Sequence, residues 1–135
     1  MFLQPKRLKF NKVKKGKIYK LKHKLNRLRY GSVGLKSIES GMISARQLES
    51  SRQAIMRKIK RKGKLWIRVY PFVPVTRKPV EVRMGKGKGS VDHYSAKVSC
   101  GVIVFELFGA SKSVSIAAFK TGGAKLPVKT KIVYY

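Results

Sequence analysis

The feature of this sequence that most constrains its fold is the distribution of charge along the chain. No Asp or Glu precedes Glu39, whereas Lys and Arg recur throughout residues 1–38. A segment that carries one sign of charge repels itself and buries too little apolar surface to fold alone. We therefore expect a basic arm over residues 1–38 and a globular domain over residues 39–135.

The chain as a whole is strongly basic. It contains 33 Lys and Arg residues against five Asp and Glu residues, which gives a net charge of +28. A large polyanion is needed to neutralise such a surface, and nucleic acids and acidic membranes both qualify. A membrane partner usually leaves a long apolar span or a lipidation signal, and neither is found. We expect a nucleic-acid partner, no membrane span and no homo-oligomer.

An amphipathic helix is predicted near the start of the globular domain. Ser44 and Gln47 have the spacing of a capping box, and Gly63 supplies a stop signal, so the helix should run for about 18 residues. Apolar side chains share one face and mostly basic side chains share the other: Leu48, Ile55 and Ile59 against Arg46, Gln53, Arg57, Lys60 and Arg61. The basic face either binds an anion or is simply solvated.

Alternating apolar residues after this helix predict five short strands, at residues 65–70, 80–84, 94–98, 102–108 and 128–134. A second helix is expected over residues 112–121, with Gly122 and Gly123 weakening its end. Two helices segregated from a mainly antiparallel sheet make an α+β, two-layer sandwich, to which the basic N-terminal extension is added.

The first predicted strand and a glycine-rich segment are candidate RNA-binding sites. Trp66, Arg68 and Tyr70 share one face of the strand, where they could stack on bases and contact phosphates, or could instead pack against the second helix. The run at residues 85–89, Gly-Lys-Gly-Lys-Gly, lacks the spacing of a nucleotide-binding loop. Its small residues allow close backbone approach to phosphates, although an exposed hairpin tip would have the same composition.

Residues suited to catalysis or metal binding are scarce. His23 and His93 are the only histidines, and Cys100 is the only cysteine, so no internal disulfide can form. The adjacent Asp92 and His93 would project to opposite faces of a strand. A Ser/His/Asp site assembled by the fold stays open, but we expect no catalytic residues, no metal ligands and no cofactor.

Several ordered motifs across nearly the whole chain carry a family resemblance. They are Leu3-Gln4-Pro5-Lys6-Arg7, Lys9-Phe10, Gly34-Leu35-Lys36, Ser44-Ala45-Arg46-Gln47, Gly63-Lys64, Trp66-Ile67-Arg68-Val69, Val82-Arg83-Met84-Gly85-Lys86-Gly87-Lys88-Gly89 and Lys125-Leu126-Pro127. In this order they resemble the bacterial and organellar large-subunit ribosomal protein family L-sixteen.

The resemblance implies a structural constituent of the large ribosomal subunit that is not an enzyme. Family members bind large-subunit rRNA near the peptidyl transferase centre and the aminoacyl-tRNA corridor, beside neighbouring ribosomal proteins, and support late assembly and tRNA accommodation. Together with the charge pattern, it predicts rRNA binding by Lys6, Arg7, Lys9, Lys12, Lys14, Lys15, Arg46, Arg57, Arg61, Trp66 and Arg68. The predicted tRNA-corridor loop is Arg83, Met84, Gly85, Lys86, Gly87, Lys88 and Gly89, in which Arg83 matches an arginine hydroxylated in some bacterial members.

The chain also departs from the pattern of this family. Substitutions that affect expected local contacts lie at Phe72, Val73, Tyr94, Cys100, Val102 and Gly122-Gly123. A free RNA-binding chaperone or regulator, or a membrane-active basic protein, is the alternative function. Because the resemblance begins at the first residues, we expect the arm to belong to the mature protein and not to a transit peptide. Abundant Lys, Ile and Tyr favour the mitochondrial matrix over the plastid stroma or the bacterial cytoplasm.

Overall fold

The computed structural model describes residues 3–18 and 27–134 of the chain, so part of the predicted arm, residues 1–2 and 19–26, and His23 with it, lies outside the described residues. The described elements follow in the order β1 (Val33–Ser37), β2 (Gly41–Ser44), α1 (Ala45–Lys58), β3 (Lys64–Ile67), β4 (Val73–Arg77), β5 (Ser90–Val98), β6 (Ile103–Phe108), α2 (Lys112–Gly123) and β7 (Thr130–Tyr134).

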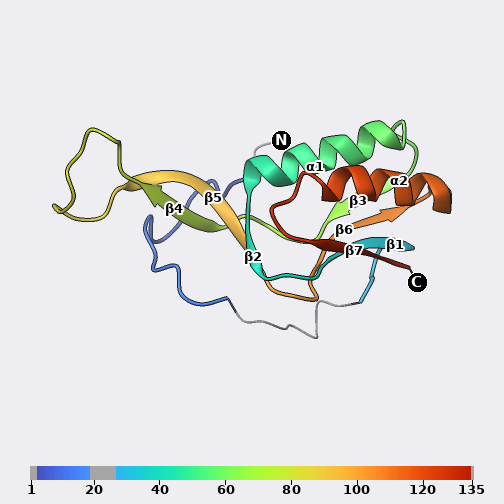
Figure 1. Cartoon of the computed structure of the whole chain (residues 1–135), viewed down its shortest axis with the longest axis horizontal. Coiled ribbons are helices and arrows are strands. Elements are labelled where there is room, and N and C mark those ends of the chain that lie inside the picture. Colours follow the sequence, from blue (N-terminus) through green and yellow to red (C-terminus); the bar gives the residue numbers. More distant parts are fainter. Residues whose placement is uncertain (1–2, 19–26, 135) are drawn as a thin grey trace.

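Within the described residues, two antiparallel sheets and two helices make up the fold. One sheet has the order β3-β6-β1-β7, and the other has the order β2-β5-β4. The helices α1 and α2 lie side by side over the sheets, while β4 and β5 carry a long loop away from the body (Figure 1). The predicted α+β sandwich is confirmed. Neither helix in the described part has the length and apolarity needed to cross a membrane.

The hydrophobic core lies between the helices and the inner faces of the strands. Its largest fully buried apolar side chains include Phe105 of β6, Phe119 of α2 and Ile55 of α1. Gly122 lets the helices approach closely, because a Cβ atom there would lie 2.4 Å from Cγ1 of Ile55. Gly123 is also helical, so α2 continues through both glycines that were expected to weaken its end.

The start of α1 is the capping box that the sequence predicts. The Ser44 hydroxyl accepts a hydrogen bond from the backbone N–H of Gln47 at 3.3 Å, and the Gln47 side chain accepts one from the Ser44 N–H at 2.9 Å. The helix has 14 residues, fewer than predicted. Lys60 and Arg61 have positive φ angles of 52° and 60°, and this left-handed turn ends the helix before Gly63 is reached.

The strand predictions were correct in part. Strands do form within residues 64–67, 90–98, 103–108 and 130–134, but the strand predicted at residues 80–84 is wrong. That segment is an exposed loop, in which Val80 is 93% exposed and Met84 is 95% exposed. No strand in the part of the chain that the structure describes pairs with this segment, and β4, which the sequence analysis missed, ends at Arg77 before the segment begins.

Two further strands, β1 and β2, were also missed. The strand β1 lies between β6 and β7 inside the four-stranded sheet, and Val33, Leu35 and Ser37 are buried there. The boundary drawn after residue 38 therefore falls after the first strand of the sandwich, and residues 33–37 pack with the globular part of the chain.

Candidate nucleic-acid interface

The first part of the basic arm, residues 3–18, is fastened to the folded body at its start. Leu3 is 9% exposed and belongs to the hydrophobic core. The basic residues predicted to bind rRNA follow it and are all exposed: Lys6, Arg7, Lys9, Lys12, Lys14 and Lys15. A buried apolar anchor thus holds a cationic chain on the surface, where its charges are available to a polyanion.

The loop between β4 and β5, residues 78–89, is the second cationic segment, and we call it the projecting loop. Arg83, Lys86 and Lys88 are exposed, and Lys78 donates a hydrogen bond through Nζ to the Gly85 carbonyl. The φ angles of residues 85, 86 and 87 are all positive, at 104°, 51° and 86°. Glycine adopts this conformation without strain, so the glycines serve the path of the backbone here.

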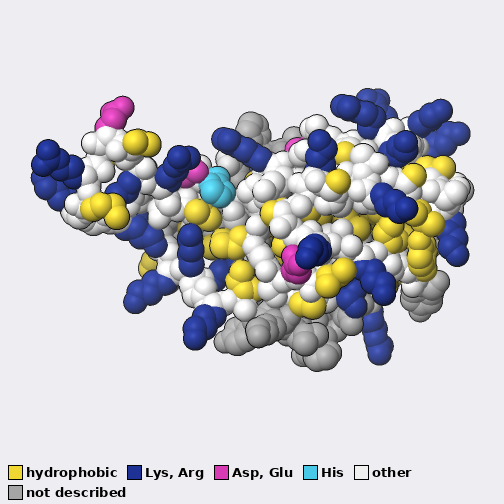
Figure 2. Space-filling view, viewed as in Figure 1, with side chains coloured by type: hydrophobic (Ala, Val, Ile, Leu, Met, Phe, Trp, Pro, Cys, Tyr) yellow, Lys and Arg dark blue, Asp and Glu magenta, His cyan; other side chains and the backbone are white. Residues whose placement is uncertain are grey.

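The structure brings the arm and the projecting loop together. Lys12 donates a hydrogen bond through Nζ to the carbonyl of Lys88 at 2.9 Å, and Lys88 donates one through Nζ to the carbonyl of Val13 at 2.7 Å. Two segments about 75 residues apart in sequence therefore form one cationic surface. In Figure 2 Lys and Arg side chains crowd the end of the molecule that Figure 1 identifies as this loop.

The outer face of α1 is a separate cationic surface. Arg46 and Arg57 of the helix are exposed as predicted, and so is Arg61 in the turn that follows it, while Leu48 and Ile55 face the core. A shallow hollow of about 660 Å³ is lined by Arg52, Gln53, Met56, Arg57, Lys60 and Arg61. Figure 1 places α1 on the body, away from the tip of the projecting loop, so a partner that contacts both surfaces must be large.

The acidic residue on α1 offsets part of this charge. Glu49 accepts hydrogen bonds from Arg52 Nε at 2.9 Å and from Nη2 of the same guanidinium at 2.7 Å. These bonds lower the pKa of Glu49 from its ordinary value of 4.5, and they raise the pKa of Arg52. Both groups are therefore charged near neutral pH, and the Arg52 guanidinium is paired with Glu49, which leaves it less able to bind an external anion.

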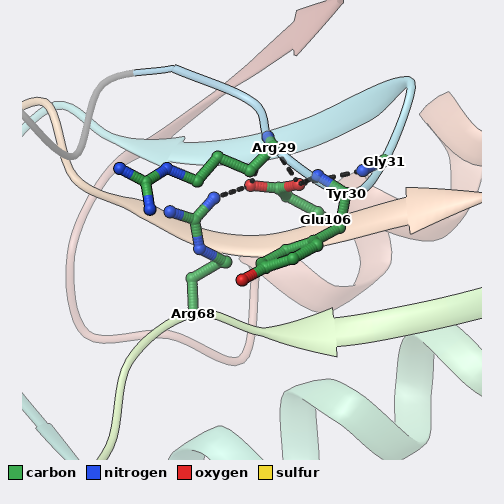
Figure 3. A network of polar contacts seen from close by, with 5 residues as sticks. All are labelled: Arg29, Tyr30, Gly31, Arg68 and Glu106. Carbon is green, nitrogen blue, oxygen red and sulfur yellow. Dashed lines mark hydrogen bonds and ion pairs between the residues drawn. The ribbon is translucent and has the colours of Figure 1, made fainter.

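A third cluster surrounds Glu106 of β6, an inner strand of the four-stranded sheet. This carboxylate is fully buried and points into the turn formed by the backbone of residues 29–31 (Figure 3). It accepts hydrogen bonds from the N–H groups of Arg29, Tyr30 and Gly31 at 3.1, 2.7 and 2.9 Å. Arg68, which directly follows β3, completes the network with an ion pair.

Two aromatic rings lie beside this polar network. Tyr30 stacks on Trp66 with ring centroids 5.9 Å apart and an interplanar angle of 24°. The Arg68 guanidinium lies 5.4 Å from the centre of the Tyr30 ring, and Lys64 Nζ lies 5.3 Å from the centre of the Trp66 ring. Tyr70, the third member of the predicted face, is exposed, and among the described residues it has no contact with the rings of Tyr30 and Trp66.

Sequence reasoning identified Trp66 and Arg68 but missed Tyr30 and Glu106. Arg68 was predicted to contact rRNA, but its side chain is only 11% exposed and turns towards Glu106. The residue is therefore largely internal. Glu106 was detectable as a lone carboxylate inside the apolar run Ile-Val-Phe-Glu-Leu-Phe. A buried charge requires a partner, and that requirement points to a nearby cation.

The prediction that Asp92 and His93 project to opposite faces was wrong. Both lie in β5, yet Asp92 Oδ2 is 2.7 Å from His93 Nδ1. The register explains this contact, since Val75 pairs with His93 and Thr76 pairs with Val91, which leaves Asp92 as the extra residue of a β-bulge. The His93 hydrogen bond is the main cause that lowers the pKa of Asp92.

No group of three or more His, Cys, Asp and Glu residues in the described part of the chain is arranged to hold a metal ion. The ionisable side chains there form ion pairs and exposed cationic surfaces. The site and fold together define a small, basic α+β protein with exposed cationic surfaces on the arm, the projecting loop and α1.

Comparison with known proteins supplies the family. The model of the family described as "Ribosomal protein L16p/L10e" matches residues 5–133. Proteins named "Large ribosomal subunit protein uL16" are similar over 131 residues, which is 97% of this chain: that of Bartonella bacilliformis is 52% identical over 96% of its length, and that of Cereibacter sphaeroides is 53% identical over 96%. The one from Caulobacter vibrioides is 49% identical over 92% of its length. The chain belongs to this family of ribosomal proteins, whose members are structural components and not enzymes.

Proposed function

We propose that this chain is a structural constituent of the large ribosomal subunit that binds large-subunit rRNA. Its relatives carry the name of a large-subunit protein, and its charge of +28 requires a polyanionic partner. The observation that carries the proposal is the cationic surface made by the arm and the projecting loop, which are joined by Lys12 and Lys88. Phosphate contacts from exposed lysines and arginines position such a protein on RNA.

The finer placement follows from the family resemblance. We infer that the projecting loop lies near the peptidyl transferase centre and the aminoacyl-tRNA corridor, and that the chain supports late subunit assembly and tRNA accommodation. Exposed Arg83 and Lys86 at the end of a long hairpin suit this role, because they reach beyond the body without disturbing its core. Peptide-bond chemistry belongs to the RNA, and the partners would be rRNA, neighbouring ribosomal proteins and nearby aminoacyl-tRNA.

Co-sedimentation tests this function against that of a free RNA chaperone or regulator. Tagged protein expressed in its native cell should sediment with the large subunit and stay bound through a high-salt wash. A protein held by many phosphate contacts alone would dissociate as salt rises, whereas one packed into folded rRNA would remain. Recovery of the chain mainly in the ribosome-free fraction would reject the proposal in favour of the regulator.

The compartment is a further part of the proposal. The Lys, Ile and Tyr content favours a mitochondrial ribosome, whereas the relatives named above come from bacteria. Mass spectrometry of ribosomes from purified organelles, compared with ribosomes from the surrounding cytosol, tests the mitochondrial prediction. Presence of the chain in the organellar large subunit alone would support it, and absence from that subunit would contradict it.

A further inference from the structure

The residues before β1 cross the face of the four-stranded sheet that points away from the helices. Glu106 of β6 pairs with Trp66 of β3 and with Gly34 of β1, and directly paired residues share one face of a sheet. Leu28 packs on this face at Gly34, where a Cβ atom would lie 2.4 Å from the leucine Cδ2 atom. The missing side chain of Gly34 therefore provides the space in which the crossing segment docks.

Glu106 fixes the same segment by its backbone. Successive N–H groups that converge on one anion form a nest, and here the anion is the buried carboxylate that receives Arg29, Tyr30 and Gly31. The Tyr30 N–H makes the shortest of these bonds, at 2.7 Å. These backbone contacts thus set the direction of the Tyr30 side chain, whose ring lies against Trp66 and 5.4 Å from the Arg68 guanidinium.

Tyr30 remains accessible although it is held. Its ring stacks on Trp66, yet the residue is 56% exposed. A monomer that only needed to fold could bury this ring or use a polar side chain instead. A fixed, exposed aromatic ring loses little conformational entropy when a flat ligand packs against it.

The charges around the rings indicate which flat ligand fits. Arg68 is neutralised by Glu106 and is nearly buried, whereas Lys64 is exposed beside the Trp66 ring. An exposed ammonium group next to stacked aromatic rings matches a nucleotide, whose base offers a π-face and whose phosphate offers a negative charge. An apolar peptide would match the rings but would leave the lysine without a partner.

We propose that Tyr30 and Trp66 form a platform on which one unpaired RNA base stacks, with Lys64 placed to contact the adjoining phosphate. The inference rests on the proposed rRNA-binding function and deepens it by assigning recognition of a base to a surface distant from the projecting loop. Glu106 and Arg68 hold the platform in place and contact no RNA.

The test compares two ligands on the full-length protein. One is a short single-stranded RNA of mixed sequence, and the other is an oligomer of the same length made of abasic ribose phosphates. Trp66 is the only tryptophan in the chain, so its fluorescence reports on the platform. The RNA with bases should quench this fluorescence and bind about 5- to 150-fold more tightly than the abasic oligomer, which is the range for one stacked base.

Matched tyrosine variants locate the effect. Tyr30→Leu should bind the RNA with bases no more tightly than the abasic oligomer, while Tyr30→Phe should behave as the unchanged protein. Tyr70→Leu is the control, because Tyr70 is similarly exposed but lies outside the stack. An equal loss in Tyr30→Leu and Tyr70→Leu would overturn the assignment of the platform to Tyr30.

If Tyr30→Leu does not fold, the comparison of the two oligomers on the unchanged protein still decides between the outcomes. Equal affinity for both oligomers, with no quenching by the RNA with bases, would overturn the stacking inference and leave electrostatic RNA binding in place. Failure to bind either oligomer at low salt would contradict the proposed RNA-binding function itself. Tighter binding of the oligomer with bases, accompanied by quenching, supports the platform.

Discussion

The sandwich body and the projecting loop both contain apolar side chains, but these are buried in the body and exposed in the loop. In β6 the largely apolar run of residues 103–108 is buried almost throughout, and it supplies Phe105 and Leu107 to the core. In residues 80–84 apolar and charged side chains alternate, and Val80 and Met84 are almost fully exposed. The difference lies in what each segment pairs with, since β6 has strands on both sides and no strand of the described residues pairs with the loop. The body therefore holds the core, and the exposed loop adds little to it.

Removing the buried carboxylate of Glu106 should destabilise the sandwich body more than any other substitution considered. We expect Glu106→Ala to lower the free energy of unfolding by roughly 3–5 kcal/mol, because Arg68 and three backbone N–H groups lose their shared acceptor. Chemical denaturation measures the loss. Glu106→Gln keeps an acceptor oxygen without the charge and should lose less; equal stability of the alanine variant and the unchanged protein would contradict the role of the network.

Two substitutions in α1 compare the buried face of the helix with its exposed face. Ile55 is fully buried, so Ile55→Ala should lower the free energy of unfolding by about 2–5 kcal/mol. Arg57 is exposed two residues away, so Arg57→Ala should change stability by less than about 0.5 kcal/mol while weakening RNA binding. Thermal melts and RNA titrations of both variants decide this, and the reverse pattern would mean that the two faces are misassigned.

The smallest expected effect concerns the ion pair on the surface of α1. The pKa of Glu49 is lowered below 4.5 by Arg52, so the pair stabilises the protein above that pH and loses its effect as the pH falls through the lowered value. Because the pair is partly exposed, its contribution should stay below about 0.5 kcal/mol. Glu49→Gln should therefore melt slightly lower than the unchanged protein at pH 7, with the gap closing in acid. A gap that is independent of pH would exclude this ion pair as its cause.

The elements that sequence analysis predicted correctly carry local signals. The capping box of Ser44 and Gln47 and the apolar stripe through Ile55 are sufficient to place α1, because both features lie within the helix itself. The positive φ angles of Lys60 and Arg61 have no such signal in the residue types, and this is why the end of α1 was placed too late.

The elements that it missed depend on distant partners. The strand β1 is short and contains Gly34, and its position between β6 and β7 is decided by residues far along the chain. In β4 Pro74 argues against a strand, although pairing with β5 on one side tolerates it at the edge of its sheet. The contact of Tyr30 with Trp66 likewise depends on tertiary docking, so no local pattern reveals it.

The last prediction concerns the exposed cationic residues of the projecting loop. Arg83, Lys86 and Lys88 are exposed and add nothing to the core, so replacing all three by Ala should change the free energy of unfolding by less than about 0.5 kcal/mol. Large subunits that contain this variant should be defective in aminoacyl-tRNA binding or in late maturation, because the cationic end of the hairpin is lost.

The decisive measurement is aminoacyl-tRNA binding to purified ribosomes that carry the triple loop variant, alongside a thermal melt of the free protein. A matched control removes three exposed lysines of the body instead: Lys112, Lys120 and Lys131. We expect an unchanged melt for the loop variant together with weaker tRNA binding than the control shows. Normal tRNA binding and maturation with the loop variant, or a collapsed melt, would contradict the proposed role of the projecting loop.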